Sequence, residues 1–341
     1  MTRQHRIWIF VALGILLSAC SGPTAPTPSA NKNPTPDTPR KSGTIRFSIQ
    51  GAANVTDVPW LMALDLLKEQ GYTIEQVSLS SADLITAALI RGDIDVGSAS
   101  TNFTWTAIAK GAGIRTIVGR ANMTYILVAR QNILTCRDLN DKTLAFSSRQ
   151  AVGYIMYEKY LAQNCPGVVP KIILMSESKN RVAALIANEV DGAYLEVEDW
   201  VNLQRQSPGK FHVLIDFAKE FPEIQYSIYS MRQEWAQQHP EAVKDYIAAL
   251  ITSDRQVMSN PQALQDGIVK YLSLDPTRAQ ELGAAYIAAG TWDLNGGLNN
   301  NNLQKTLDFM VSSGSVPPNI PVEKVADLTY LNAVLDRIGR K

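Results

Sequence analysis

The chain has 341 residues, of which 45% are hydrophobic, and its 32 basic side chains balance its 32 acidic ones. A chain of this length can bury a large core and is expected to divide into two domains. Its zero net charge gives no indication of a nucleic-acid partner or of attraction to an acidic membrane surface. The three histidines and three cysteines do not fall at zinc-ligand spacings, so we expect neither a metal site nor a cofactor.

Residues 1–19 are typical of a signal peptide. Arg3 and Arg6 precede an apolar run at residues 7–17, which is too short for the roughly 30 Å of membrane hydrocarbon. The run ends in Leu-Ser-Ala-Cys, which resembles the lipobox of bacterial lipoproteins, and we therefore expect lipid on Cys20. Proline, threonine and serine are frequent after it, so residues 20–42 are predicted to form a disordered tether outside the cell.

The folded region is predicted to begin with a strand over residues 44–50. Loop 51–54 follows at the strand's end, where Asn54 can contact a ligand. Pro59 predicts the start of a helix that runs to residue 70 and stops at Gly71. Trp60 on its first turn is either part of the core or an aromatic wall for a flat ligand.

One pattern then occurs twice along the chain. Residues 84–100 read LITAALIRGDIDVGSAS, and residues 182–196 read VAALIANEVDGAYLE. Each predicts a short helix, a stop at a glycine or asparagine, and a strand opened by Asp95 or Asp191. The two repeat units indicate two lobes that face each other across one cleft, although helix–strand units also recur in unrelated α/β proteins.

The residues at the end of each repeat unit are candidate ligand contacts, because ligands of open α/β sheets bind beyond the carboxyl ends of the strands. These candidates are Ser100, Thr101, Asn102, Tyr194 and Glu196. A carboxylate at Glu196 can accept hydrogen bonds from ring N–H, amine or hydroxyl donors. The acidic residues beside it equally suit a solvated helix start.

Predicted strands over residues 115–119 and 125–130 lie between the two units. The second strand is expected to carry the chain to the other lobe, with Asn122 near the hinge and Tyr125 available to stack on a ligand.

A second polar loop, residues 147–153, connects a predicted strand at 143–146 to a predicted helix at 154–163. The N–H groups at the start of this helix make Ser148 and Arg149 candidate contacts, with Tyr154 as a stacking partner. Ordinary N-capping by Ser147 or Ser148 is the alternative.

Two cysteines, Cys136 and Cys165, remain after lipidation of Cys20. Both lie in the predicted second lobe, and the compartment is oxidising, so a disulfide between them is a hypothesis. Strands over residues 212–217 and 225–230 are expected to close the second lobe and return to the first. From residue 233 onward the sequence is helical.

Four stretches together resemble the solute-binding lipoproteins of ABC importers, in the group that binds sulfonates, nitrate and thiamine-precursor pyrimidines. They are the two repeat units, DLNDKTLAFSS at residues 138–148, and LQKTLDFMVSSG at residues 303–314. The resemblance implies an α/β, two-lobed type II periplasmic-binding fold with its ligand cleft between the lobes. It divides the chain into a first lobe at residues 43–129 and 226–341 and a second lobe at residues 130–225. Family members often carry a Trp-Glu-Pro string after the second unit, where this chain reads Glu196-Val197-Glu198.

The resemblance also implies a function. The protein would be lipid-anchored to the cell membrane, capture a small molecule on the extracytoplasmic side as its hinge closes, and deliver it to a permease and its ATPase without a chemical step. The candidate contacts are mostly neutral or aromatic, with Arg149 opposed by Glu196, which favours a neutral, flat ligand. Riboflavin is the best match, with a thiamine-precursor pyrimidine, an alkanesulfonate or nitrate as alternatives.

Two further functions use the same fold. A thiamine-pyrimidine synthase needs a cleft histidine, whereas His212 and His239 do not follow predicted strand ends. A chemoreceptor-type sensor that does not transport its ligand is the other alternative. The resemblance therefore favours a protein that is not an enzyme.

Overall fold

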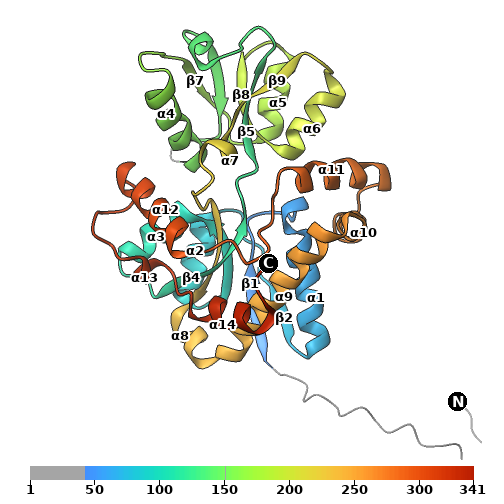
Figure 1. Ribbon diagram of the computed structural model, residues 1–341, viewed down its shortest axis with the longest axis vertical. Coiled ribbons are helices and arrows are strands. Elements are labelled where there is room, and N and C mark those ends of the chain that lie inside the picture. Colours follow the sequence, from blue (N-terminus) through green and yellow to red (C-terminus); the bar gives the residue numbers. More distant parts are fainter. Residues whose placement is uncertain (1–42, 150) are drawn as a thin grey trace, which may run out of the picture. The chain divides into compact units, whose positions relative to one another are not determined.

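The computed structural model describes residues 43–149 and 151–341, which form two five-stranded mixed sheets surrounded by helices (Figure 1). The expected signal peptide, Cys20 and the tether lie outside the described residues. Within the described part of the chain, no helix combines the length and the apolar character that crossing a membrane requires.

The first sheet has the strand order β2-β1-β3-β10-β4. Its strands are β1 (Thr44–Ser48), β2 (Thr73–Gln76), β3 (Val96–Ser100), β4 (Ile114–Ala121) and β10 (Ser227–Arg232). β1 runs parallel to both β2 and β3, whereas β10 runs antiparallel to both β3 and β4. The sheet is therefore complete only when the chain has returned to it at residue 227.

The second sheet has the equivalent order, β7-β6-β8-β5-β9, with β5 as its antiparallel member. Its strands are β5 (Tyr125–Arg130), β6 (Thr143–Phe146), β7 (Lys171–Leu174), β8 (Gly192–Glu196) and β9 (Phe211–Asp216). All five come from one continuous stretch of chain. The boundary expected at residue 129 falls inside β5, so the chain changes sheets after Ala121.

Helices cover both sheets, and every element after β10 is a helix. They are α1 (Val58–Gln70), α2 (Ala82–Arg91), α3 (Thr101–Ala109), α4 (Val152–Asn164), α5 (Ser178–Ile186), α6 (Val197–Gln206), α7 (Phe217–Glu220), α8 (Gln233–Gln238), α9 (Pro240–Ser259), α10 (Pro261–Leu272), α11 (Pro276–Ala288), α12 (Asn300–Ser312), α13 (Val322–Val325) and α14 (Thr329–Ile338), with 3-10 turns η1 (Val55–Asp57) and η2 (Cys136–Leu139).

The two repeat units form equivalent elements, α2 with β3 and α5 with β8. Their helices stop at Gly92 and Asn188, which have φ angles of 80° and 64° in the left-handed region. The acidic residue of each unit ties its strand to the neighbouring one. The Asp95 carboxylate accepts the Arg46 N–H at 3.0 Å, and the Asp191 carboxylate accepts the Thr143 N–H at 2.8 Å.

The two lobes contact each other on both sides of the strands that connect them. On one side α6 packs on α11, where Arg278 donates to the Asn202 side chain at 2.5 Å. On the other side the Lys159 ammonium of α4 lies 5.1 Å from the ring centre of Phe309 on α12. These contacts limit how the lobes can move without breaking packed surfaces.

Cys136 and Cys165 are joined by a disulfide, with their Cα atoms 6.1 Å apart. The bond links η2 to the residue that ends α4, so it closes a loop of 29 residues within the second lobe.

The first prediction concerns this disulfide. Cys165→Ser should lower the free energy of unfolding by about 3 kcal/mol, because the unfolded chain regains the entropy of the closed loop. Urea unfolding of the purified protein with and without a thiol reductant tests this. The reductant should destabilise the wild type by a similar amount and leave Cys136→Ser/Cys165→Ser unchanged, and an equal response of both proteins would contradict the prediction.

Candidate functional site

A cavity of about 200 Å³ lies where the first sheet meets the two connections between the lobes. Its walls include Ser98 and Ser100 at the end of β3, Arg120 at the end of β4, and Glu196 at the end of β8. Most of the remaining lining comes from loop 50–56 and from the connecting segments around residues 122–125 and 226–227. The cavity therefore collects strand ends from both lobes, which is where open α/β sheets bind ligands.

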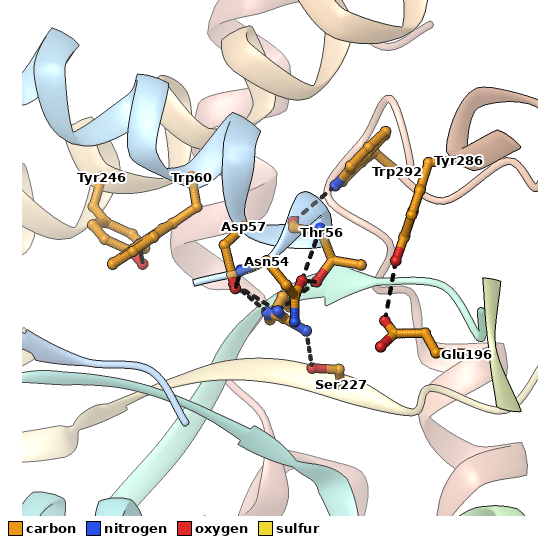
Figure 2. A network of polar contacts seen from close by, with 10 residues as sticks. Asn54, Thr56, Asp57, Trp60, Glu196, Ser227, Tyr246, Tyr286 and Trp292 are labelled. Atoms are coloured by element: carbon orange, nitrogen blue, oxygen red, sulfur yellow. Dashed lines mark hydrogen bonds and ion pairs between the residues drawn. The ribbon is translucent and has the colours of Figure 1, made fainter. Parts of the chain in front are cut away.

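Among the described residues, Arg120 is the only basic one that lines this cavity. Its guanidinium donates to Asp57 Oδ1 at 2.5 Å, to Thr56 Oγ1 at 2.6 Å and to the Ser227 hydroxyl at 3.5 Å. Figure 2 shows Thr56 and Asp57 on one side of this network and Ser227 on the other. The exposed fractions of the Arg120 and Asp57 side chains are 14% and 2%. Burial disfavours the charge on Arg120, but the Asp57 carboxylate outweighs it and holds the pKa of Arg120 above its ordinary value.

Asn54 fixes the loop that carries Asp57. Its side-chain oxygen accepts the Thr56 N–H at 2.9 Å, and Asp57 accepts the Asn54 N–H at 3.0 Å. This reciprocal capping box holds the 3-10 turn at the entrance to α1. Trp292 adds a further restraint by donating its ring N–H to the Thr56 carbonyl at 3.2 Å.

Aromatic rings form the wall of the cavity that faces the second lobe. Tyr125 stacks on Tyr194 with ring centres 4.6 Å apart and packs against the edge of Tyr226 at 5.5 Å. Phe146 stacks on the far face of Tyr194. The Tyr226 hydroxyl, then burial, raises the pKa of Tyr125 well above its usual value, so Tyr125 keeps its proton and can donate to a ligand.

Of the carboxylates in the described part of the second lobe, Glu196 alone lines this cavity. Tyr286 of α11 donates to Glu196 Oε1 at 3.5 Å across the lobes (Figure 2). Burial raises the pKa of Glu196 from 4.5 to about 7, and Arg120 only partly opposes this. Near neutral pH the group therefore exists in both forms, and it can donate to or accept from a bound molecule.

Five of the residues expected from the sequence line the cavity: Asn54, Ser100, Asn122, Tyr125 and Glu196. Tyr194 does not line the cavity; its ring stacks on that of Tyr125, which does. Thr101 has a structural role. Its hydroxyl donates to the carbonyls of Gln225 and Tyr226 and so joins the start of α3 to the segment before β10.

Trp60 belongs to the core of the first lobe. It is 1% exposed, its ring N–H donates to the Tyr246 hydroxyl at 2.9 Å, and Phe47 packs against it edge to face. Figure 2 shows Trp60 and Tyr246 together, on the opposite side of Asp57 from Glu196.

The remaining expected residues lie elsewhere. Asn102 and Arg149 line a separate groove of about 940 Å³ between α2, α3 and α4. Arg149 also sits on the ring of Tyr154, which packs against Phe146. Ser148 does not line the cavity that contains Arg120 and Glu196.

Arg120, Asp57 and Ser227 line or support the cavity but are not among the residues expected from the sequence. The strand predicted over residues 115–119 stops one residue before Arg120, whereas β4 extends to Ala121. The only signal for it is an arginine near the end of an apolar strand, and its acidic partner lies 63 residues away. As a result Arg120, not Arg149, is the basic group that opposes Glu196.

The sequence profile of the NMT1/THI5-like family matches residues 63–264. The chain belongs to this family. The taurine-binding periplasmic protein of Escherichia coli is 23% identical over 198 residues, which span 57% of this chain and 60% of that relative.

Solved structures similar to this NMT1/THI5-like protein include periplasmic binding proteins. The aliphatic sulphonate-binding protein of Escherichia coli aligns with a TM-score of 0.66 and 18% identity, covering 84% of this chain and 92% of that one. The nitrate-binding protein of Synechocystis PCC 6803 aligns with a TM-score of 0.64 and 13% identity, covering 87% and 89%. The expected α/β, two-lobed periplasmic-binding fold is confirmed.

The second prediction follows from Glu196. Because its pKa is raised in the folded protein, the unfolded chain ionises first, and stability should fall as pH rises from about 4.5 to about 7. Glu196→Gln should remove this loss and stabilise the ligand-free protein at pH 8 by about 3 kcal/mol, with little effect at pH 4.5. Urea unfolding across this pH range measures it. The exposed Glu189→Gln is the control, and parallel pH profiles of wild type and Glu196→Gln would refute the prediction.

The third prediction concerns the support behind Tyr125. A Cβ at Gly153 would lie 2.1 Å from the Tyr194 ring, which Tyr125 and Phe146 hold on both faces. Gly153→Ala should therefore cost about 1–3 kcal/mol of stability and displace the stack. The control is Gly113→Ala, because a Cβ there meets nothing within 4 Å. Equal urea midpoints for the two variants would show that Tyr194 moves freely.

Proposed function

We propose that this protein is the extracytoplasmic solute-binding component of an ABC importer. It would hold a small molecule in the cavity between Arg120 and Glu196 and present it to a permease with its ATPase. The observation that supports this most directly is that the strand ends of both lobes converge on one polar cavity beside the two connections. Lipid on Cys20, which would anchor the protein to the cell membrane, is part of the proposal.

The lining of the cavity also supports binding over catalysis. It contains neither lysine nor histidine among the described residues. His212 lies within β9, and His239 packs against the ring of Trp235 beside α9. A fold-related pyrimidine synthase would need a histidine in the cleft, so we give that function less weight.

The side chains of the cavity suit a ligand that has a hydrogen-bond acceptor at one end and a donor at the other. Arg120 and Ser227 offer donors, while Glu196 offers an acceptor to an amine or ring N–H. Tyr125 between them offers a flat surface to an aromatic ring. Riboflavin and a thiamine-precursor pyrimidine both satisfy this pattern. The aminopyrimidine is the better match of the two, because ligand pockets for larger molecules usually exceed about 300 Å³.

An aminosulfonate is the second candidate. A sulfonate suits Arg120, an ammonium group suits Glu196, and the relative from Escherichia coli is named for taurine. Nitrate and simple alkanesulfonates match less well, because neither offers a donor to the ionised form of Glu196.

The fourth prediction identifies the ligand by calorimetric titration with riboflavin, the aminopyrimidine and taurine. One of them should bind with one-to-one stoichiometry. Glu196→Gln should weaken that ligand at least tenfold at pH 7, because it loses a charge-assisted hydrogen bond. Tyr125→Leu should weaken a heteroaromatic ligand about tenfold and leave taurine almost unchanged.

Arg149→Gln is the matched control, because Arg149 lies outside this cavity and should leave the affinity unchanged. Binding by none of the three compounds below millimolar concentration would refute the proposed ligand classes. An effect of Arg149→Gln equal to that of Glu196→Gln would place the site in the groove beside α4 instead.

A further inference from the structure

Tyr286, near the end of α11, and Trp292, just after it, form a buried aromatic pair to which the proposed function assigns no role. Their rings stack with centres 6.2 Å apart, and the two residues are 0% and 3% exposed. Between them the chain turns at Gly290, where φ is 61°, and the Thr291 hydroxyl donates to the Tyr286 carbonyl at 2.7 Å. This turn holds the Trp292 ring beside the Tyr286 ring.

The pair reaches both charged sides of the candidate cavity. The Tyr286 hydroxyl donates to Glu196 Oε1 at 3.5 Å. The Trp292 ring N–H donates to the Thr56 carbonyl at 3.2 Å, and the Thr56 hydroxyl accepts from Arg120. Figure 2 shows the two rings side by side, with the Tyr286 hydroxyl directed at Glu196 and the Trp292 nitrogen directed at Thr56. Neither ring lines the cavity, so the pair would act on a bound molecule only through these neighbours.

Apolar packing holds the second lobe against the same pair. Val197 and Val201 of α6 pack against the buried cluster that contains both rings. Because α6 begins directly after Glu196, this packing fixes the helix that follows the carboxylate. Close-packed side chains leave little room for sliding. As a result α11 places Glu196 relative to the first lobe, although a strand of the second lobe carries it.

The charge states of Tyr286 and Glu196 suit a hydrogen bond in this direction. Burial, and then the negative charge of Glu196, raises the pKa of Tyr286 well above its usual value, so the hydroxyl keeps its proton. The ionised carboxylate can only accept, and a bond to a charged acceptor is stronger than one between neutral groups. Tyr286 therefore holds the ionised form of Glu196 in one orientation.

We propose that Tyr286 and Trp292 are positioning residues that set the separation between Arg120 and Glu196 and so select the length of the molecule that bridges them. This rests on the proposed function, in which the cavity holds a ligand between these two groups. A molecule of the wrong length leaves either the guanidinium or the carboxylate without its partner, and an unpaired buried polar group is costly. The selection then depends on α11 as well as on the lining of the cavity.

The fifth prediction is a pH profile that needs no ligand. Tyr286→Phe keeps the ring and removes the donor to Glu196. Because the ionised carboxylate loses this donor, the pKa of Glu196 should rise further, and the fall in stability with pH should extend about half a pH unit higher than in the wild type. Urea unfolding across the neutral range measures this. In the Glu196→Gln background the same substitution should leave the profile unchanged.

Tyr330→Phe is the matched control, because it removes a hydroxyl that donates to the Ala236 carbonyl at 3.1 Å, away from Glu196. It should lower the free energy of unfolding without moving the pH profile. If the profile of Tyr286→Phe coincides with that of the wild type, Tyr286 does not position Glu196 and the proposal fails, whichever compounds bind.

The same variants test the selection of length. The probes are aminomethanesulfonate, taurine and 3-aminopropanesulfonate, whose charged ends are separated by progressively longer carbon chains. In calorimetric titrations the wild type should bind one of them at least about tenfold more tightly than the others. Tyr286→Phe and Trp292→Phe should reduce this preference to about threefold or less, whereas Tyr330→Phe should retain it.

The outcomes separate this proposal from the proposed function. An equal loss of affinity for all three aminosulfonates in Tyr286→Phe and Trp292→Phe would overturn the selection of length, because the pair would then support the site without setting its span. Absence of binding to the wild type, together with the upward shift of the pH profile, would overturn the aminosulfonate as ligand and support the placement of Glu196 by Tyr286.

Discussion

The first sheet closes around β10, a strand that the chain reaches only after it has built the second sheet. β10 lies between β3 and β4, and its first residue, Ser227, pairs with Ser100 on one side and Ala121 on the other. This insertion forces the two connections between the lobes to run side by side. The strand ends, the tyrosines of the connections and the candidate cavity are together because β10 lies between β3 and β4 in that sheet.

The ion pair between Arg120 and Asp57 depends on the same arrangement. β4 carries the arginine, the turn before α1 carries the aspartate, and β10 provides Ser227. An ion pair this buried adds little net stability, because both charges lose their water. What the pair does fix is the position of Arg120 in the lining of the polar cavity.

The local features of this fold could be predicted from the sequence. The repeat units showed their helices, their stops at Gly92 and Asn188 and the strands after Asp95 and Asp191, because apolar spacing and left-handed residues act over a few positions. Those two aspartates tie neighbouring strands together and do not face the cavity. A repeated acidic residue in the sequence therefore marked a structural role that depended on the pairing of strands.

The site was only partly predictable, because several of its contacts join residues that are distant in the sequence. Glu196 follows from the rule about strand ends, and Tyr125 follows from its place at the start of the connecting strand. Arg120, however, needs a partner 63 residues away, and Trp60 lies in the core because it bonds to Tyr246, 186 residues away. Contacts between residues this far apart in the chain cannot be predicted from the pattern of neighbouring residues. Arg149 looked like the basic group of the site because its loop is polar, whereas the structure turns it onto Tyr154.

The continuous origin of the second sheet has a consequence for how the chain is made. Ribosomal synthesis delivers the whole of β5 to β9, with both cysteines of the disulfide, before β10 exists. The second lobe can therefore fold and cross-link while the first still lacks β10, the strand between β3 and β4. Until residue 232 emerges, the facing edges of β3 and β4 lack their partner, and they are the part of the nascent protein most exposed to incorrect strand pairing.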